Sequence, residues 1–380
     1  MECYLDNAAT TQAYEDVCEL VAKVMREDYG NPSSLHMKGV EGEKYVREAA
    51  DRIAKTLKCQ RKNIVFSSGG TESNNTALIG TALANKRRGR RILTTCFEHA
   101  SVHEPLIYLE SMGFQVEYLP VDEQGHLKTE TLKEALTEDT ILVSVMMVNN
   151  EIGSVLDVQE LAKVVKDFDP QIIFHVDAIQ AYGKMKIQPA KWQIDLMSVS
   201  GHKIHGPKGT GFLYVRNGLE LPAYIDGGSQ ENGRRAGTSN VPGIVGLGKA
   251  CEIAARNMSR NINNMTRLRN RIIYKIKKGL PDAVLTGSEQ MRLPNNISFC
   301  FPHVESSQLL AILDTHGICA SAGSACSTGA AGPSHVLIAM GINPELAGGS
   351  LRLTISDETT IEEADYVADT VIKTVKKLTI

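Results

Sequence analysis

Seven short apolar runs alternate with longer amphipathic segments between Ile64 and Val215, and this alternation limits the chain to few folds. A strand that is apolar on both faces has to be covered by helices on both sides, as in the βαβ units of a parallel sheet. The runs lie in NIVFSSG, RILTTCFEH, FQVEYLPVD, TILVSVMMVNNE, QIIFHVDAIQ, DLMSVSGHK and GTGFLYVR. The pattern predicts an α/β fold with a mostly parallel, seven-stranded sheet.

The remainder of the chain predicts a second, smaller α+β unit. A long helix is expected from about Val241 to Leu280, followed by the shorter strands NISFCF and SLRLTIS. The last helix begins with a capping box at Thr360 to Glu363. With 380 residues, 42% of them apolar, the chain is long enough for two domains. We expect a large domain over residues 15–255 and a small domain from residues 1–14 and 256–380.

An early helix is also expected, because apolar residues recur at helical spacing near the N-terminus. Its apolar stripe is expected to be core and consists of Val17, Leu20, Val21, Val24 and Met25.

Composition excludes several classes of partner and compartment. The chain has 41 basic and 44 acidic side chains, so no overall field attracts nucleic acid or an anionic membrane. The start, MECYLDNAATT, lacks the regions of a secretory signal, and no apolar window reaches the length of a membrane span. We therefore expect a cytoplasmic protein. The eight cysteines form no C-x-x-C pair, so no metal site is predicted.

Lys203 lies where an apolar strand gives way to a turn rich in glycine, in the segment DLMSVSGHKIHGPKGTG. Open α/β sheets bind their ligands at the carboxyl ends of strands. An amine at this place can form an imine with an aldehyde or hold a phosphate. For this motif taken alone, a solvated loop lysine is the alternative.

Other polar residues follow other strands of the predicted sheet. SSGGTESNN opens a helix after a strand, so its backbone N–H groups and the Thr71 hydroxyl can hold a phosphate. His99, Asn150 and Asp177 follow three more strands, with Gln180 close behind. Singly, such residues are commonly helix caps or core residues. Together they suit pyridoxal phosphate, which needs a lysine, a carboxylate at its ring nitrogen, a flat group over the ring and a phosphate cradle.

The order of these motifs resembles that of the fold-type-I pyridoxal-phosphate enzymes, and among them the cysteine desulfurases. The resemblance covers almost the whole chain, in the segments YLDNAATT, NPSSLH, SGGTESNN, NNEIG, DAIQ, SGHKIHGPKG, RRAGT and SLR. It implies that the cofactor is pyridoxal 5'-phosphate and that the substrate is L-cysteine.

The resemblance also implies roles around the cofactor ring. Lys203 would carry the cofactor and move the proton at the substrate Cα, and His99 would stack on the ring and assist. Asp177 would pair with the ring nitrogen, and Gln180 would hydrogen-bond the phenolic oxygen.

For the phosphate and the substrate, the resemblance implies a second set of residues. Thr71, Ser200 and His202 would hold the phosphate, together with Thr238 of a neighbouring subunit, so a homodimer is implied. Asn150 and Arg352 would bind the substrate carboxylate. Strand alternation agrees for the arginine, because Leu351, Leu353 and Ile355 share the opposite face.

Cys326 lies in the loop ASAGSACSTGAAGPSH, residues 320–335, which is too rich in glycine for a stable helix and too poor in large apolar groups for a core strand. A thiolate on such a loop is an accessible nucleophile. The motif resembles that of desulfurases with a long mobile loop.

The implied role of Cys326 is to take the substrate sulfur as a persulfide and pass it to an acceptor protein. The acceptor would be an iron–sulfur scaffold, a tRNA-thiolating enzyme or a thiamine-pathway carrier. A selenocysteine lyase and a catalytically silent scaffold protein are the alternatives, and the intact Lys203, Asp177 and Cys326 argue against the second.

Overall fold

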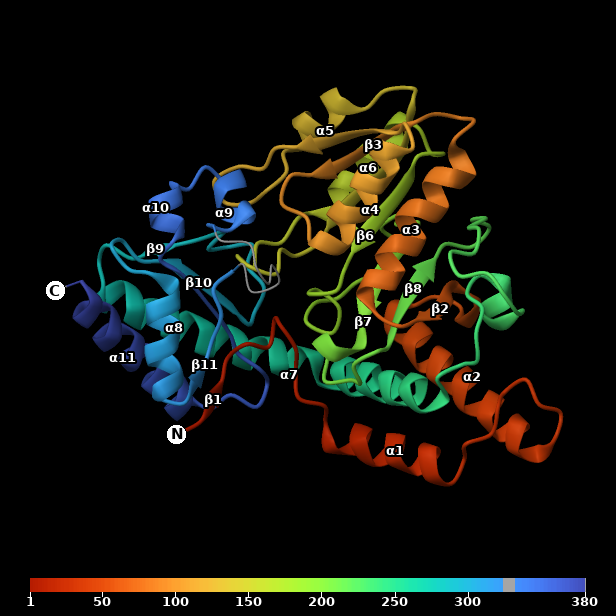
Figure 1. Cartoon of the computed structure of the whole chain (residues 1–380), viewed down its shortest axis with the longest axis horizontal. Coiled ribbons are helices and arrows are strands. Elements are labelled where there is room, and N and C mark those ends of the chain that lie inside the picture. The colour runs from red at the N-terminus through yellow and green to blue at the C-terminus, as the bar shows by residue number, and fades with distance from the viewer. Residues whose placement is uncertain (324–331, 380) are drawn as a thin grey trace.

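The seven strands expected between Ile64 and Val215 form one sheet in the computed structural model, which describes residues 1–323 and 332–379 (Figure 1). The strand order is β2-β8-β7-β6-β5-β3-β4. β8 is antiparallel to β2 and β7, and the other pairs are parallel. The predicted mostly parallel α/β fold is confirmed. The strands are β2 (Ile64–Ser67), β3 (Arg91–Thr95), β4 (Gln115–Leu119), β5 (Thr140–Met146), β6 (Ile173–Asp177), β7 (Leu196–Ser200) and β8 (Gly211–Val215).

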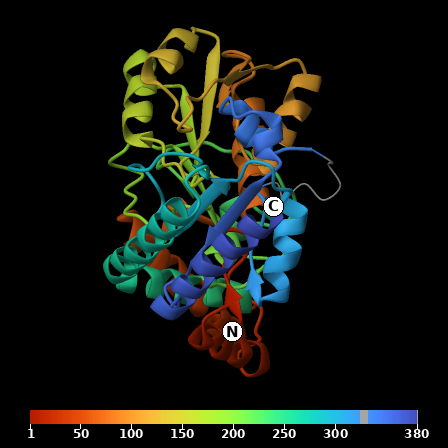
Figure 2. The same ribbon diagram turned by 90° about the vertical axis from the view of Figure 1, so that its left-hand side faces the viewer.

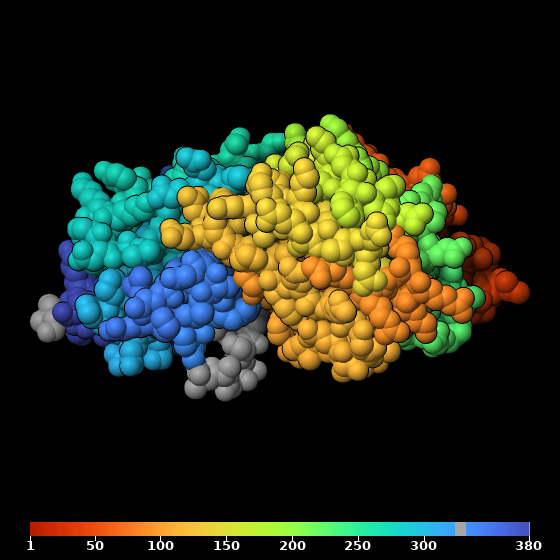
Figure 3. All heavy atoms as spheres, turned by 90° about the horizontal axis from the view of Figure 1, so that it is seen from above, coloured from red at the N-terminus to blue at the C-terminus, as the bar shows by residue number. Residues whose placement is uncertain are grey.

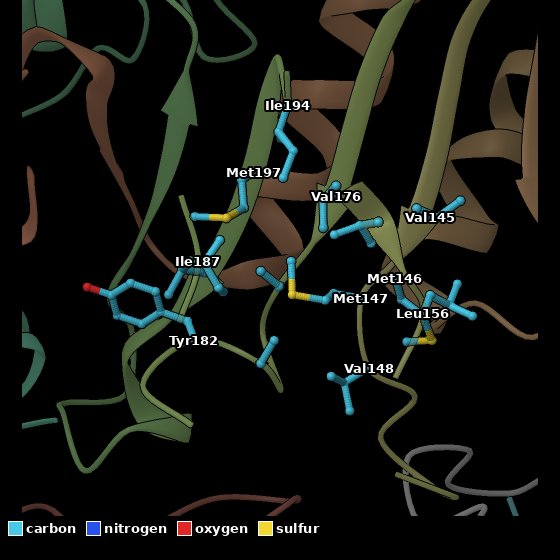
Figure 4. Packing of buried hydrophobic residues seen from close by; sticks show 14 of the residues in the cluster. Val145, Met146, Met147, Val148, Leu156, Val176, Tyr182, Ile187, Ile194 and Met197 are labelled. Atoms are coloured by element: carbon cyan, nitrogen blue, oxygen red, sulfur yellow. The ribbon is translucent and has the colours of Figure 1, made fainter. Parts of the chain in front are cut away.

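Helices cover both faces of this sheet because successive strand residues point to opposite sides. Leu142 and Ile173 pack with α3 (Gly70–Asn85) and α4 (Ala100–Ser111) on one face. Their neighbours Val143 and Phe174 belong to the core on the other face, with α2 (Met37–Leu57), α5 (Thr129–Ala135) and α6 (Val158–Phe168). Figure 4 shows part of this second core, where Val145, Val176 and Met197 come from three adjacent strands.

A second layered unit contains the three-stranded antiparallel sheet β12-β10-β9 and a two-stranded parallel pair, β1 with β11. Helices α8 and α11 pack beside each other against it (Figure 2). The capping box predicted at the start of α11 is confirmed. The elements are β1 (Cys3–Tyr4), β9 (Val284–Leu285), β10 (Asn296–Cys300), α8 (Ser306–Thr315), β11 (Ile318–Cys319), β12 (Ser350–Thr354) and α11 (Ile361–Leu378).

The long helix expected from about Val241 is confirmed as α7 (Val241–Gly279), which runs beneath both units (Figure 1). Its first half contributes Leu247 to the large core, and its second half contributes Ile272 to the small core. The small core also takes Leu5 from the N-terminal segment. These contacts are consistent with domains at 15–255 and at 1–14 plus 256–380, and the boundaries stay a prediction.

Helix α1 (Glu15–Arg26) corrects one expectation. Val17 and Val24 are buried as expected, but Met25 is 64% exposed, so its assignment to the core was wrong. At about 100° per residue, Met25 lies about 80° from Val17 around the helix, at the margin of the buried stripe.

The short helices α9 (His335–Ala339) and α10 (Pro344–Ala347) join the two units at one edge of the large sheet. Val336 and Leu337 belong to the large core, and the blue surface around these helices lies against the yellow and orange part of the molecule in Figure 3. Across the described ranges, no helix combines the length and apolar character that a bilayer crossing requires.

His175 links three strands inside the sheet, and it makes stability depend on pH. Its ring nitrogens lie 2.8 Å from Ser144 Oγ and 3.0 Å from Ser198 Oγ. Burial lowers the pKa of His175 to about 3, from 6.5. Between these values the unfolded chain binds more protons than the folded one, so the free energy of unfolding falls as pH falls.

We predict that His175→Gln flattens this dependence, because Gln can bond both serines without titrating. Between about pH 6.5 and about pH 4.5, urea denaturation should show the wild type losing roughly 2–3 kcal/mol more than the variant. His316→Gln, the same change at an exposed site, should keep the wild-type slope. Equal slopes for wild type and His175→Gln would contradict the prediction.

Candidate active site

The carboxyl ends of the central strands bring most of the predicted site residues to one edge of the large sheet. β6 ends at Asp177 and β7 at Ser200, and the 3₁₀ turn Gly201–Lys203 follows directly. His99 is the N-cap of α4, after β3, and Thr71 lies in the first turn of α3, after β2.

Asp177 is a buried carboxylate that accepts hydrogen bonds at both of its oxygens. It is 4% exposed, and it accepts bonds from the Ile179 N–H and from Asn74 Nδ2, each at 2.9 Å. Burial raises its pKa, and these two bonds together with the charges of His99 and Lys203 oppose the rise. Asn74 was missed by the sequence reasoning, although it lies in the motif SGGTESNN.

Lys203 and Gln180 meet at the same stretch of N-terminal backbone. Lys203 Nζ donates to the carbonyl oxygens of Ala8 and Ala9, the second at 2.6 Å. Gln180 Nε2 donates to Ala8 O at 3.0 Å. The motif YLDNAATT therefore supplies backbone acceptors to the lysine, a role that its side chains did not indicate.

His99 and Thr71 line one cavity of about 760 Å³. His99 Nδ1 accepts the Ser101 N–H at 3.1 Å, which fixes the ring at the start of α4. His202 Nδ1 lies 3.2 Å from Thr10 Oγ1. Burial and nearby lysines, Lys203 first, lower the pKa of His202 to about 4, so its imidazole is neutral near pH 7.

The N-terminus of α3 is open to an anion. Its N-cap is Gly69, which has φ of +153° and provides no capping side chain. A Cβ built on Gly69 would lie 3.7 Å from Ser200 Oγ, so the Ser200 hydroxyl stands beside this helix end. The N–H groups of the first turn point outward with partial positive charge, which suits a phosphate.

Arg352 is 1% exposed and lies at the interface between the two units. One terminal nitrogen forms an ion pair with Asp6 Oδ1 at 2.8 Å, and the other donates to Asn150 O at 3.1 Å. Among the described residues, its buried Nε has no hydrogen-bond partner. Asn150 and Arg352 are thus brought together, and Asp6 is a partner that sequence reasoning did not identify.

Two predicted residues are not placed with the others. Thr238 is exposed and lines a separate cavity of about 260 Å³, near Arg235, whose guanidinium pairs with Glu72. Cys326 lies outside the described residues. The seven cysteines within them are free thiols, and burial raises the pKa of Cys319, the cysteine closest to the loop in sequence.

These groups fit pyridoxal phosphate by their chemistry. Asp177 offers a buried carboxylate next to cationic groups, the uncapped α3 N-terminus with Ser200 offers an anion cradle, and Lys203 offers an amine. The described residues contain no group of three or more His, Cys, Asp or Glu side chains arranged to hold a metal ion.

Comparison with known proteins gives one consistent family. The class-V aminotransferase family model matches residues 3–367. The chain is 45% identical to the cysteine desulfurase IscS of Dictyoglomus turgidum, over 99% of this chain and 95% of that protein. It is 43% identical to the cysteine desulfurase IscS of Methanosarcina thermophila, over 99% and 92%.

Solved structures agree with the sequence comparison. A NifS-like protein matches with a TM-score of 0.94 and 37% identity, covering 99% of this chain and 100% of that one. A structure of SspA in complex with cysteine matches with a TM-score of 0.83 and 31% identity, covering 94% and 100%.

We predict that Asn74→Ala weakens the binding of pyridoxal phosphate about tenfold, because a hydrogen bond to a buried charged group is lost. Without that donor, the pKa of Asp177 rises further and less of the carboxylate is ionised to pair with the ring. Absorbance titration of the cofactor-free protein measures the affinity. Asn85→Ala, on the same helix but with its side chain bonded to Thr81 O, is the matched control. Unchanged affinity in Asn74→Ala would remove Asn74 from the site.

Proposed function

Because the chain belongs to the class-V aminotransferase family and, within it, to the cysteine desulfurases, we propose that it converts L-cysteine to L-alanine and transfers the sulfur, as a persulfide on Cys326, to acceptor proteins. The acceptors would use the sulfur for iron–sulfur clusters, thio-tRNA or other thio-cofactors. The observation that carries the proposal is the N-terminal segment 6–9. Its Ala9 O accepts the amine of Lys203, whose charge acts on Asp177, and its Asp6 pairs with Arg352.

Pyridoxal 5'-phosphate is the proposed cofactor. Lys203 would hold it covalently, and His99 would stack on its ring. Asp177 would pair with the ring nitrogen, and Gln180 would hydrogen-bond the phenolic oxygen. Thr71, Ser200 and His202 would hold its phosphate. When bound, the cofactor supplies an aldehyde for the amines of lysine and substrate and a ring that accepts electrons from the substrate Cα.

The chain's own residues would then bind the substrate and move its protons. Arg352 and Asn150 are the proposed partners of the substrate carboxylate. The Nε of Arg352 has no partner within residues 1–323 and 332–379, which supports an additional acceptor there. Lys203 would take the proton from the substrate Cα and return it, assisted by His99. The low pKa of His202 keeps a neutral ring beside the phosphate site, where the ring can donate a hydrogen bond without adding charge.

Sulfur transfer would be a nucleophilic step at Cys326. Its thiolate attacks the substrate sulfur, an S–S bond forms, and the bond between the substrate Cβ and sulfur breaks. The electron pair of that bond stays on Cβ, which takes up a proton to become the methyl group of alanine. Cysteine and enzyme thiol thus give alanine and enzyme persulfide, with no other reactant consumed.

A homodimer is part of the proposal, since Thr238 of a second copy would complete the phosphate site. Its exposure in one chain, in a cavity other than that of Thr71 and His99, is compatible with a role across an interface. The proposed compartment is the cytoplasm.

We predict that Cys326→Ala binds the cofactor and still exchanges the substrate's Cα proton with deuterated water, while production of alanine and protein persulfide stops. The earlier steps use Lys203, His99 and Asp177, which the variant keeps. Mass spectrometry of recovered cysteine and alanine measures both reactions. Cys319→Ala, a neighbouring partly buried thiol in β11, should behave as wild type. Continued alanine production by Cys326→Ala would instead favour a lyase that releases the chalcogen unaided.

We also predict that Arg352→Ala raises KM for cysteine at least tenfold, because a charge-assisted bond to the substrate carboxylate is lost. The absorbance spectrum of the resting cofactor should stay unchanged. Arg271→Ala serves as the control, since this exposed arginine pairs with Asp365 and lies on α7. A KM equal to that of wild type would make the buried Arg352–Asp6 pair purely structural.

A further inference from the structure

Glu151 is a buried acid beside the active site that has no role in the proposed reaction. It lies in the segment VNNEIG and is 5% exposed. Its backbone is fixed on both sides, because Asn149 Oδ1 accepts its N–H at 2.9 Å and Asn296 Nδ2 donates to its carbonyl at 3.2 Å. The carboxylate therefore extends from a backbone that is tied to both structural units.

The carboxylate reaches the chain on both sides of residues 324–331. On the C-terminal side, the Ser334 hydroxyl donates a hydrogen bond to Glu151 Oε2. Ser334 is also the N-cap of α9, where its Oγ accepts the Val336 N–H at 3.1 Å. The hydrogen bond to Glu151 thus fixes Ser334, the N-cap of α9.

On the N-terminal side, Gly323 lies directly against the same oxygen. A Cβ built on Gly323 would be 2.2 Å from Glu151 Oε2, and the three atoms nearest to it all belong to Glu151. Two residues earlier, Ser321 exchanges backbone hydrogen bonds with Arg352 in β12. The chain up to Gly323 is therefore held to the substrate side of the site.

Two of the charges that act on Glu151, those of Arg352 and His99, belong to candidate site residues. Burial raises the pKa of its carboxyl, while the Ser334 hydroxyl and the charges of His335, Arg352 and His99 oppose the rise. The Glu151 carboxyl thus interacts electrostatically with residues of the site and contacts both flanking segments, at Ser334 and at Gly323.

We propose that Glu151 is a positioning residue that holds Gly323 and Ser334 against one carboxylate, and so fixes the two points between which the segment carrying Cys326 runs. Fixing two points of a chain lowers the entropy cost of bringing a group between them to a site. Glu151 would thus support the sulfur-transfer step without touching the substrate. This inference rests on the proposed function of Cys326.

The test separates the two halves of the reaction in the holoenzyme. At saturating cysteine, Glu151→Ala should lower alanine formation at least tenfold, while Cα-proton exchange stays within about twofold of wild type. Glu151→Gln keeps an acceptor oxygen for Ser334 and should recover at least about a third of the wild-type alanine rate. Asn343→Ala, which removes the N-cap of the neighbouring helix α10 without touching Glu151, should leave both rates within about twofold.

A double-mutant cycle tests the contact itself. Gly323→Ala places a methyl group against the Glu151 carboxylate, so it should lower alanine formation about tenfold in the wild-type background. In the Glu151→Ala background the space is open, and the same change should cost less than about twofold. An equal loss in both backgrounds would overturn the proposal, as would a parallel fall of exchange and alanine formation in Glu151→Ala. Alanine formation that persists in Cys326→Ala would overturn the proposed function instead, whatever the Glu151 variants do.

Discussion

Burying the carboxylate of Asp177 at the end of β6 costs free energy that its neighbours have to offset. The Ile179 N–H and Asn74 Nδ2 do so in part, and the charges of His99 and Lys203 favour the ionised form. The sheet fixes this arrangement, because Asp177 is flanked in register by Met146 of β5 and Ser198 of β7. A carboxylate in such a low-dielectric place would act strongly on the cationic ring nitrogen of the proposed cofactor.

The N-terminal segment is the second constraint on the site. Asp6 pairs with Arg352, and the carbonyls of Ala8 and Ala9 accept the amine of Lys203. One short stretch of chain thus connects the residue proposed for the substrate carboxylate with the residue proposed for the cofactor. Gln180 joins the same stretch through Ala8 O. The distance between substrate and cofactor groups therefore depends on backbone that belongs to neither helix nor long strand.

Much of this architecture follows from sequence periodicity. All seven strands of the large sheet, the long helix α7 and the capping box of α11 could be predicted, since each rests on a local pattern of apolar residues or caps. The exposure of Met25 could not be predicted, because this residue lies at the margin of the apolar stripe and its burial depends on what packs nearby.

The candidate site divides in the same way. Residues at strand ends, such as Asp177 and Lys203, have a local signal, because polar groups interrupt apolar runs there. Contacts between residues that are far apart in the sequence have no such local signal. The pair of Asp6 with Arg352 joins residues 346 positions apart, and the contact of Glu151 with Ser334 joins residues 183 apart.

The sequence separation of Asp6 and Arg352 also sets an order on synthesis. At about 5–20 residues per second, Asp6 leaves the ribosome's catalytic centre roughly 17–70 s before Arg352 is made. β11, the strand that pairs with β1, is made only shortly before Arg352, so through most of synthesis both the strand pair and the site are incomplete.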